Sequence, residues 1–114
     1  MNETEHLLVI LEEECVEVAQ EISKALRFGM DEMMPGQTLT NRERILRELN
    51  DLWAAVEMLD LQQVDRAAIE RKKVKVAKFM DYAKNCGTLK PNDQDQRPGA
   101  LSGPLERFVG HHGS

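Results

Sequence analysis

Residues 44–59 read RILRELNDLWAAVEML, and this stretch carries the clearest helical pattern in the chain. Its apolar residues recur every three or four positions, which places them along one side of an α-helix. Thr40 and Glu43, just before it, have the spacing of a capping box at a helix start. We therefore expect a helix from near Thr40 to about Leu61, with an apolar stripe of Ile45, Leu49, Leu52, Val56 and Leu59.

Upstream, residues 11–22 read LEEECVEVAQEI and belong to a second helical pattern. Asn2 and Glu5 form another capping-box pair, and Gly29 suits the position just past a helix end. We expect a helix over about residues 3–28. Its predicted apolar stripe comprises Leu7, Leu11, Val18, Ile22, Ala25 and Leu26.

The rest of the chain sets the domain organisation. A Pro-Gly pair marks residues 30–39 as a loop, and a third helix is expected over about 66–84, with a Cys-Gly pair as its stop. Beyond it the sequence has little apolar periodicity. We predict an all-α fold, in which residues 1–86 form one helical domain with three main helices. Residues 87–114 are expected to be an extended or disordered C-terminal tail.

Composition narrows the class of protein. With 41% hydrophobic and 31% charged residues, the chain resembles a soluble helical protein and not a disordered or membrane one. The net charge of −5 argues against nucleic acid as a partner. Two cysteines are too few for a disulfide framework, and no long apolar run or signal-peptide pattern is present. We expect a cytoplasmic protein with no membrane partner.

Two pairs of acids stand out on the expected helices: Glu14 with Glu17, and Glu48 with Asp51. Residues three apart share one side of a helix, and both pairs border the apolar stripe that packs. Two antiparallel helices could thus bring four carboxylates into one small volume, where they would repel unless cations lay between them. The alternative is that these acids pair with lysine and arginine across a helix interface.

An all-carboxylate set of ligands favours one kind of metal. Mg²⁺ prefers oxygen ligands and often uses substrate phosphates as well, with Mn²⁺ as the alternative. A di-iron bundle would need Glu-x-x-His on two helices, and only Glu3 to His6 has that spacing. Metal ions held this way can clamp a triphosphate and lower the pKa of a bound water. The acids therefore indicate metal-dependent hydrolysis of a phosphoanhydride bond.

The combination of EE-x-x-E at Glu13, Glu14 and Glu17 with E-x-x-D at Glu48 and Asp51 resembles the MazG-like all-α nucleoside triphosphate pyrophosphohydrolases. The resemblance covers roughly residues 7–82. It implies Mg²⁺-dependent cleavage of NTP or dNTP to the monophosphate and pyrophosphate. Within it, the block that contains KALRFG is most similar to short stand-alone members, some of them from phages.

Carried over by this resemblance, the catalytic residues are Glu13 and four metal ligands, which are Glu14, Glu17, Glu48 and Asp51. Glu13 would hold a further ion or position the attacking water. One departure is that Asn50 stands where many members have glycine before the acid of the second motif. Family members associate into helical bundles, and the wide apolar faces of the helices also predict a homodimer or homotetramer built like a four-helix bundle.

Four further residues are candidates for binding the substrate: Lys24, Phe28, Lys72 and Lys75. The lysines could contact phosphate oxygens, and Phe28 could stack on a base. Each has a plainer alternative. Lys24 could neutralise a neighbouring acid, Phe28 could pack at the helix end, and the other two could lie along the apolar surface with their ammonium groups in water.

Two other functions stay open from the sequence. The same fold could hydrolyse a phosphoribosyl-nucleotide, as phosphoribosyl-ATP pyrophosphohydrolase-like members of the family do. The chain could also be a non-enzymatic helical interaction or regulatory protein whose acids form surface ion pairs. Release of pyrophosphate from a nucleotide would distinguish either enzyme from a non-enzymatic interaction or regulatory protein.

Overall fold

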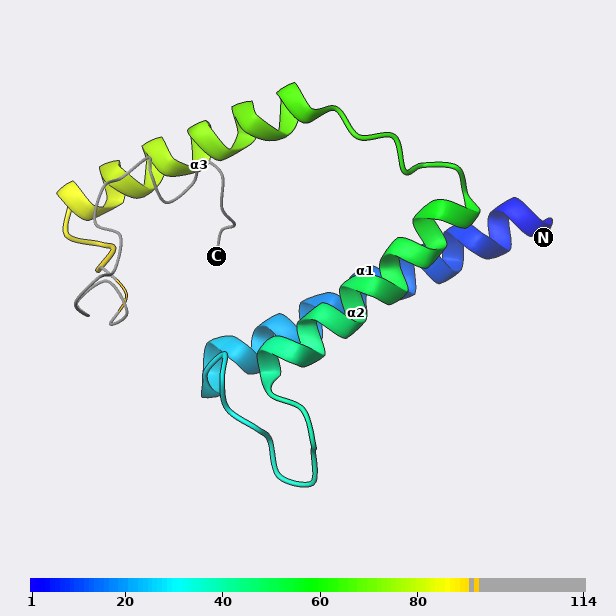
Figure 1. Cartoon of the computed structure of the whole chain (residues 1–114), viewed down its shortest axis with the longest axis horizontal. Coiled ribbons are helices and arrows are strands. Elements are labelled where there is room, and N and C mark those ends of the chain that lie inside the picture. Colours follow the sequence, from blue (N-terminus) through cyan, green and yellow to red (C-terminus); the bar gives the residue numbers. More distant parts are fainter. Residues whose placement is uncertain (91, 93–114) are drawn as a thin grey trace. The chain divides into compact units, whose positions relative to one another are not determined.

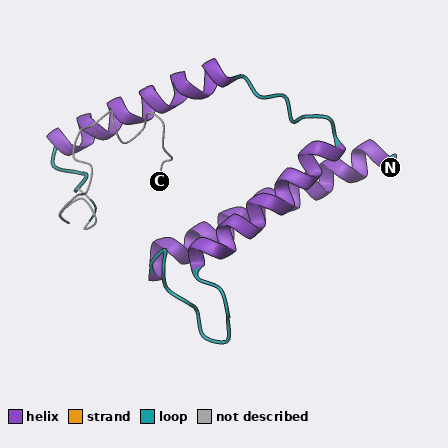
Figure 2. Ribbon diagram, viewed as in Figure 1, coloured by secondary structure: helices purple, strands orange, loops and turns teal. Residues whose placement is uncertain are grey.

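The computed structural model describes residues 1–90 and residue 92. Over these residues the regular elements are three α-helices: α1 at Glu3–Phe28, α2 at Asn41–Met58 and α3 at Arg66–Asn85 (Figure 2). The all-α prediction is confirmed for this part of the chain. The greater part of the predicted tail lies outside the described residues.

The chain divides after Gln63 into two compact units. In the first unit α1 and α2 run side by side in opposite directions, joined by the loop that precedes α2 (Figure 1). We call this pair the hairpin. The second unit contains α3 and is described by itself. No helix among the described residues is both long enough and apolar enough to cross a membrane.

Both predicted capping boxes are present. At the start of α1, Glu5 N donates to Asn2 Oδ1 at 2.8 Å, and Asn2 N donates to Glu5 Oε1 at 2.9 Å. At the start of α2, Glu43 N donates to Thr40 Oγ1 at 3.1 Å, and Thr40 N donates to Glu43 Oε1 at 2.8 Å. Each box satisfies backbone N–H groups that have no partner within the helix. The local sequence thus fixes where the two helices begin.

The end of α2 differs from the prediction. The helix stops at Met58, three residues before the expected end, and Asp60 adopts a left-handed φ of 56°. Leu61 N then donates to Val56 O at 2.9 Å, which closes the last turn. Glycine usually takes this left-handed position, and aspartate is one of the few other residues that tolerate it. The sequence therefore lacked the usual stop signal at this point.

The contact surface between α1 and α2, which we call the seam, follows alternating steps of four and three residues. These residues are all buried or half-buried. This is the spacing of a coiled coil, in which residues separated alternately by three and four positions all face the partner helix. On α1 the seam consists of Leu7, Leu11, Glu14, Val18, Glu21 and Ala25, and on α2 of Asn41, Ile45, Glu48, Leu52, Ala55 and Leu59.

The seam contains most, but not all, of the stripe that apolar periodicity predicted. Ile22, Leu26 and Leu49 were assigned to the packed stripe, yet they are 42%, 82% and 43% exposed. Glutamates occupy seam positions in their place. Consequently Ala25 and Ala55 are the only buried apolar residues of the hairpin among those described. The hairpin has little apolar core of its own.

Eight exposed apolar side chains of the hairpin lie on one side of the seam. At 100° per residue, α1 and α2 each turn an apolar row to that side, because the helices are antiparallel and their rows lie in the same rotational sense from the seam. The acids lie on the opposite side. We call the first side the apolar flank; it consists of Leu8, Cys15, Ala19, Ile22 and Leu26 from α1 and Leu46, Leu49 and Trp53 from α2.

Candidate metal centre

The two predicted acid pairs lie on the same side of the hairpin. Glu14 and Glu48 are half-buried seam residues, one on each helix. Glu17 and Asp51 follow one turn later on their helices, at the exposed edge of the seam. We call these four residues the acid cluster. The antiparallel register brings the turn of α2 that holds Asp51 beside Glu14.

Glu14 is the most strongly perturbed member of the acid cluster. Its pKa is raised from 4.5 to about 7, chiefly by a hydrogen bond with the Glu17 side chain and then by burial. The negative charges of Glu17, Asp51 and Glu48 raise this pKa further. Residues from both helices therefore act on one carboxyl group, as expected where several carboxylates share a site.

Glu48 responds in the same direction. Burial is the main cause of its raised pKa, followed by the charge of Glu17 and a hydrogen bond with Asp51. The charge of Arg47 opposes this change. The acid cluster thus holds like charges that repel across the seam.

The acid cluster suits a hard divalent cation by the chemistry of its ligands, since all of them are carboxylate oxygens. Among residues 1–90 and 92, however, no three His, Cys, Asp or Glu side chains lie close enough together to hold a metal ion. The pKa of Glu14 is raised first by its hydrogen bond with Glu17 and that of Glu48 first by burial, and repulsion between neighbouring acids raises both further. A cation would relieve the repulsion and draw the carboxylates together.

Glu13 does not join the acid cluster. It is exposed and lies further round α1 toward solvent. Its charge is not among the causes that raise the pKa of Glu14 or of Glu48. The sequence resemblance gave Glu13 a catalytic role, and its side chain stands apart from the other four predicted residues.

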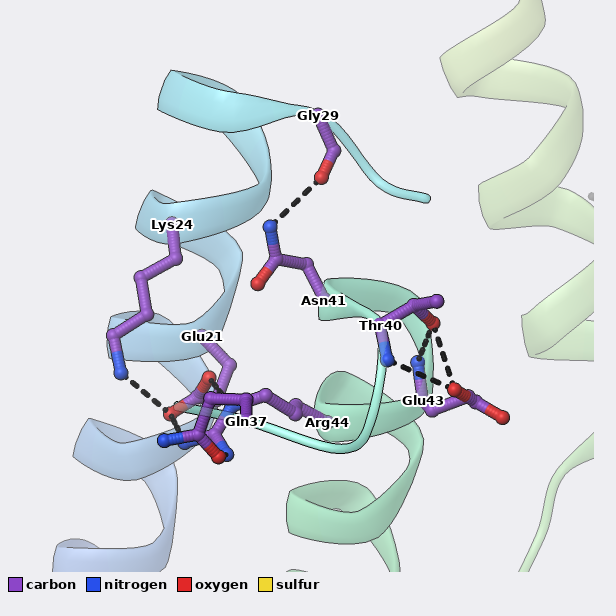
Figure 3. A network of polar contacts seen from close by, with 8 residues as sticks. All are labelled: Glu21, Lys24, Gly29, Gln37, Thr40, Asn41, Glu43 and Arg44. Carbon is purple, nitrogen blue, oxygen red and sulfur yellow. Dashed lines mark hydrogen bonds and ion pairs between the residues drawn. The ribbon is translucent and has the colours of Figure 1, made fainter. Parts of the chain in front are cut away.

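A second polar group lies on the same side of the hairpin, because Glu21 follows Glu17 by one turn of α1 and Arg44 precedes Glu48 by one turn of α2. Figure 3 shows this group. The Glu21 carboxylate accepts from Arg44 Nε at 2.8 Å, from Arg44 Nη2 at 3.3 Å and from Lys24 Nζ at 3.2 Å. The Glu21 and Arg44 side chains are only 7% and 13% exposed. The remaining end of the guanidinium, Nη1, donates to Gln37 in the loop.

The charges of this group stabilise one another. The hydrogen bond from Arg44 is the main reason that the pKa of Glu21 is lowered, and Lys24 adds to the effect. Glu21 in turn raises the pKa of Arg44, and the charge of Glu48 contributes as well. Arg44 therefore lies within the electrostatic reach of the acid cluster. Sequence reasoning missed this residue because a partner 23 positions away leaves no local spacing signal.

The predicted substrate-binding residues of the hairpin have partners within α1. Lys24 pairs with Glu21, which is the neutralising role that the sequence left open for it. Phe28 is 47% exposed, and the Arg27 guanidinium carbon lies 5.1 Å from the centre of its ring. A cation over the ring occupies one aromatic face, so any base would have to stack on the other.

Lys72 and Lys75 belong to the unit beyond Gln63 and are described with α3. Both are exposed and line a groove of about 430 Å³ on the apolar side of that helix. After the left-handed Gly87, Thr88 N and Leu89 N both donate to Ala83 O, at 3.0 and 3.2 Å. The chain therefore turns back and supplies the end of the groove, whose other lining residues are Val76, Phe79, Met80, Ala83, Thr88 and Leu89.

The loop between α1 and α2 is closed by Asn41, a buried residue that the sequence did not single out. Its Nδ2 donates to Gly29 O at 2.8 Å, and its backbone N donates to Glu32 O at 2.9 Å. Beside it, Arg42 pairs with Asp31 at 3.0 Å on the exposed surface. These bonds hold the loop that carries Gln37 against the first turn of α2.

No protein-family model, no curated protein and no solved structure matches the chain. The resemblance to the MazG-like enzymes stays a prediction that depends on the two acidic motifs.

Proposed function

We propose that this protein is a Mg²⁺-dependent nucleoside triphosphate pyrophosphohydrolase, which cleaves NTP or dNTP to the monophosphate and pyrophosphate in the cytoplasm. The observation that carries the proposal is the acid cluster, in which four carboxyl groups from two helices lie on one side of the seam and the pKa of Glu14 is raised. Strongly perturbed carboxyl groups cluster at functional sites more often than at ordinary surfaces. Repelling carboxylates on a seam reduce stability, so a role for them explains why they are there.

In this proposal Glu14, Glu17, Glu48 and Asp51 hold the divalent ions, with Mg²⁺ first and Mn²⁺ as the alternative. The bound ions would neutralise the triphosphate oxygens and lower the pKa of a water. Glu14 would give up its proton as the ions bind, because a nearby cation favours the carboxylate. Glu13, on the solvent side of the same turn, is available to orient water at the edge of the site.

The proposal includes a homodimer or homotetramer built like a four-helix bundle. Leu26, Leu49 and Trp53 of the apolar flank are 82%, 43% and 43% exposed, and large apolar patches on a hairpin call for a covering partner. A second hairpin on the apolar flank would leave the acid cluster on the opposite side open to substrate. The exposed lysines Lys72 and Lys75 of α3 are further candidates for phosphate contacts.

The test is incubation of the full chain with a panel of NTPs and dNTPs plus Mg²⁺, with phosphoribosyl-ATP included. We expect release of pyrophosphate from at least one nucleotide. Glu48→Gln should lower kcat/KM by about 100-fold or more, because one lost charge stabiliser in a catalytic site has costs of that order. Mg²⁺ should also raise the Tm of the wild-type chain by linkage, and Glu48→Gln should remove most of this rise.

Glu12→Gln is the matched control, since Glu12 is an exposed acid on the other side of α1. It should keep both the activity and the Mg²⁺-dependent rise in Tm. Release of orthophosphate alone, or of nothing from any nucleotide, would contradict the proposal. Equal losses in the Glu12 and Glu48 variants would also contradict it, because the effect would then not be specific to the acid cluster.

A further inference from the structure

We propose that Arg44 binds a phosphate oxygen of the substrate at the loop end of the acid cluster, and that Glu21 is the positioning residue that orients its guanidinium. This inference rests on the proposed function, because it names a contact to the same polyphosphate. It adds a site to the chain that neither acidic motif contains.

The orientation of the guanidinium is the first argument. Glu21 binds Nε and Nη2 of Arg44 at 2.8 and 3.3 Å, and both side chains are almost fully buried. A two-point ion pair fixes the plane of a guanidinium group as well as its position. Little conformational freedom is therefore left to be lost when the free end of Arg44 meets a ligand.

The position of Arg44 is the second argument. It stands one helical turn before Glu48, on the same side of α2, and the two side chains interact electrostatically. A polyphosphate bound through cations at the acid cluster would extend along the hairpin by the length of its phosphate groups. In the direction of the loop, Arg44 is the next half-buried cationic side chain on α2, whereas Arg47 is exposed and lies further round the helix.

Third, a bound phosphate would replace the present hydrogen-bond partner of Arg44 Nη1. Nη1 of Arg44 donates to the side chain of Gln37, which is a neutral amide on an exposed loop residue. A phosphate oxygen carries negative charge and the Gln37 amide does not, so a hydrogen bond from Arg44 to phosphate adds an attraction between opposite charges that the bond to Gln37 lacks. A phosphate oxygen can therefore displace Gln37, whose amide returns to water at little cost.

The local charge balance is the fourth argument. The single negative charge of Glu21 faces two cations, Lys24 and Arg44. This group carries an excess of positive charge beside an acid cluster that repels anions. If a triphosphate lies across both groups, its bound cations face the acid cluster and its free phosphate oxygens face the positive group.

The experiment measures binding of inorganic tripolyphosphate in the presence of Mg²⁺ by isothermal titration calorimetry, with the full chain. This probe has no base, so unknown base preference does not affect the result. We expect Arg44→Gln and Arg44→Lys to weaken binding by about tenfold or more, since a lost charged hydrogen bond has that effect. Gln37→Ala should bind as tightly as the wild-type chain or more tightly.

Arg42→Gln is the matched control. Arg42 lies two residues away in the same helix and also pairs with a loop acid, Asp31, but both are exposed. We expect it to bind tripolyphosphate like the wild-type chain. The Mg²⁺-dependent rise in Tm, measured without tripolyphosphate, reports whether each variant keeps its acid cluster, and Arg44→Lys should retain it.

Equal binding of tripolyphosphate by wild-type, Arg44→Gln and Arg44→Lys chains would overturn the inference and leave the proposed function intact. The inference would also be overturned if Arg44→Lys weakened the binding of tripolyphosphate and at the same time removed the Mg²⁺-dependent rise in Tm. Arg44 would then only hold the helices together. The inference would likewise be overturned if the wild-type chain released pyrophosphate from nucleotides but did not bind tripolyphosphate. A wild-type chain that neither binds tripolyphosphate nor acts on any nucleotide would instead contradict the proposed function.

Discussion

Glu14 and Glu48 occupy positions that a coiled coil usually gives to leucine or isoleucine. Each is half-buried, and the pKa of each is raised by burial and by neighbouring acids. Glu21 is also a seam residue, but Arg44 and Lys24 lower its pKa. The three seam glutamates therefore differ in kind: one is paired with cations, and the other two face further acids.

This difference predicts how stability depends on pH. The pKa of Glu14 is about 7 in the folded chain against 4.5 when unperturbed, so the folded form holds the proton more tightly between these values. The resulting stabilisation is complete below pH 4.5 and is lost as the pH rises through about 7. Without Mg²⁺, we expect the Tm of the wild-type chain relative to that of Glu14→Gln to fall over this range, as measured by circular dichroism.

Saturating Mg²⁺ should reverse that trend above pH 7 for the wild-type chain, because the ion replaces the proton. The comparison with Glu14→Gln removes the contribution of Glu21, whose lowered pKa acts in the opposite sense. A difference in Tm that stays constant from pH 4.5 to pH 8 would show that the Glu14 carboxyl is not perturbed.

At the scale of single elements, the helix starts were predictable and one helix end was not. Asn2 with Glu5 and Thr40 with Glu43 form the bonds that their spacing predicts. Such motifs are local, so the sequence contains all that they need. The end of α2 depends on Asp60 in a left-handed conformation, and aspartate is a far weaker signal for this than glycine.

The two capping boxes should contribute unequally. Thr40→Ala should destabilise the hairpin by about 1–2 kcal/mol, because the cap lies where the loop joins two packed helices. Asn2→Ala removes the same kind of bond at the end of α1 away from the loop and should cost less, since a helix end that the loop does not hold can fray locally without global unfolding. Urea unfolding of both variants measures the difference, and equal losses would contradict this account.

At the scale of the whole molecule, the main finding is how little apolar surface each unit buries. Ala25 and Ala55 in the hairpin and Ala77 on α3 are the buried apolar residues of the described part of the chain. Small domains need a larger core than this or an oligomer interface. The apolar flank of the hairpin is the surface that an oligomer would cover.

If the proposed oligomer forms, Leu26→Glu should convert it to monomers or unfold it, because a charge in an apolar interface is left without a partner. Val16→Glu is the matched control: Val16 is 52% exposed, but it lies on the side of α1 that faces away from both the seam and the apolar flank. Size-exclusion chromatography with light scattering should show a change for the first variant only. A wild-type chain that is monomeric at micromolar concentration would contradict the oligomer proposal.

The sequence predicted the candidate site less completely than it predicted the helices. Pairs such as Glu14 with Glu17 are visible because helical spacing is regular. Arg44 and Asn41 act through partners on α1 and in the loop, and such contacts depend on the register between two helices. Apolar periodicity alone misjudged which side of α1 packs, because it counted Ile22 and Leu26 as packed and passed over Glu21, which is buried.

A carboxyl group that changes charge near neutral pH has a consequence for how this protein can be studied. Protonated and ionised carboxyl groups differ in their infrared absorption and in the carbon chemical shift of the acid. Glu14 therefore offers an intrinsic, label-free reporter whose spectrum should respond when divalent ions are titrated into the sample at constant pH. Ion affinity could then be followed at one atom, even before any substrate is identified.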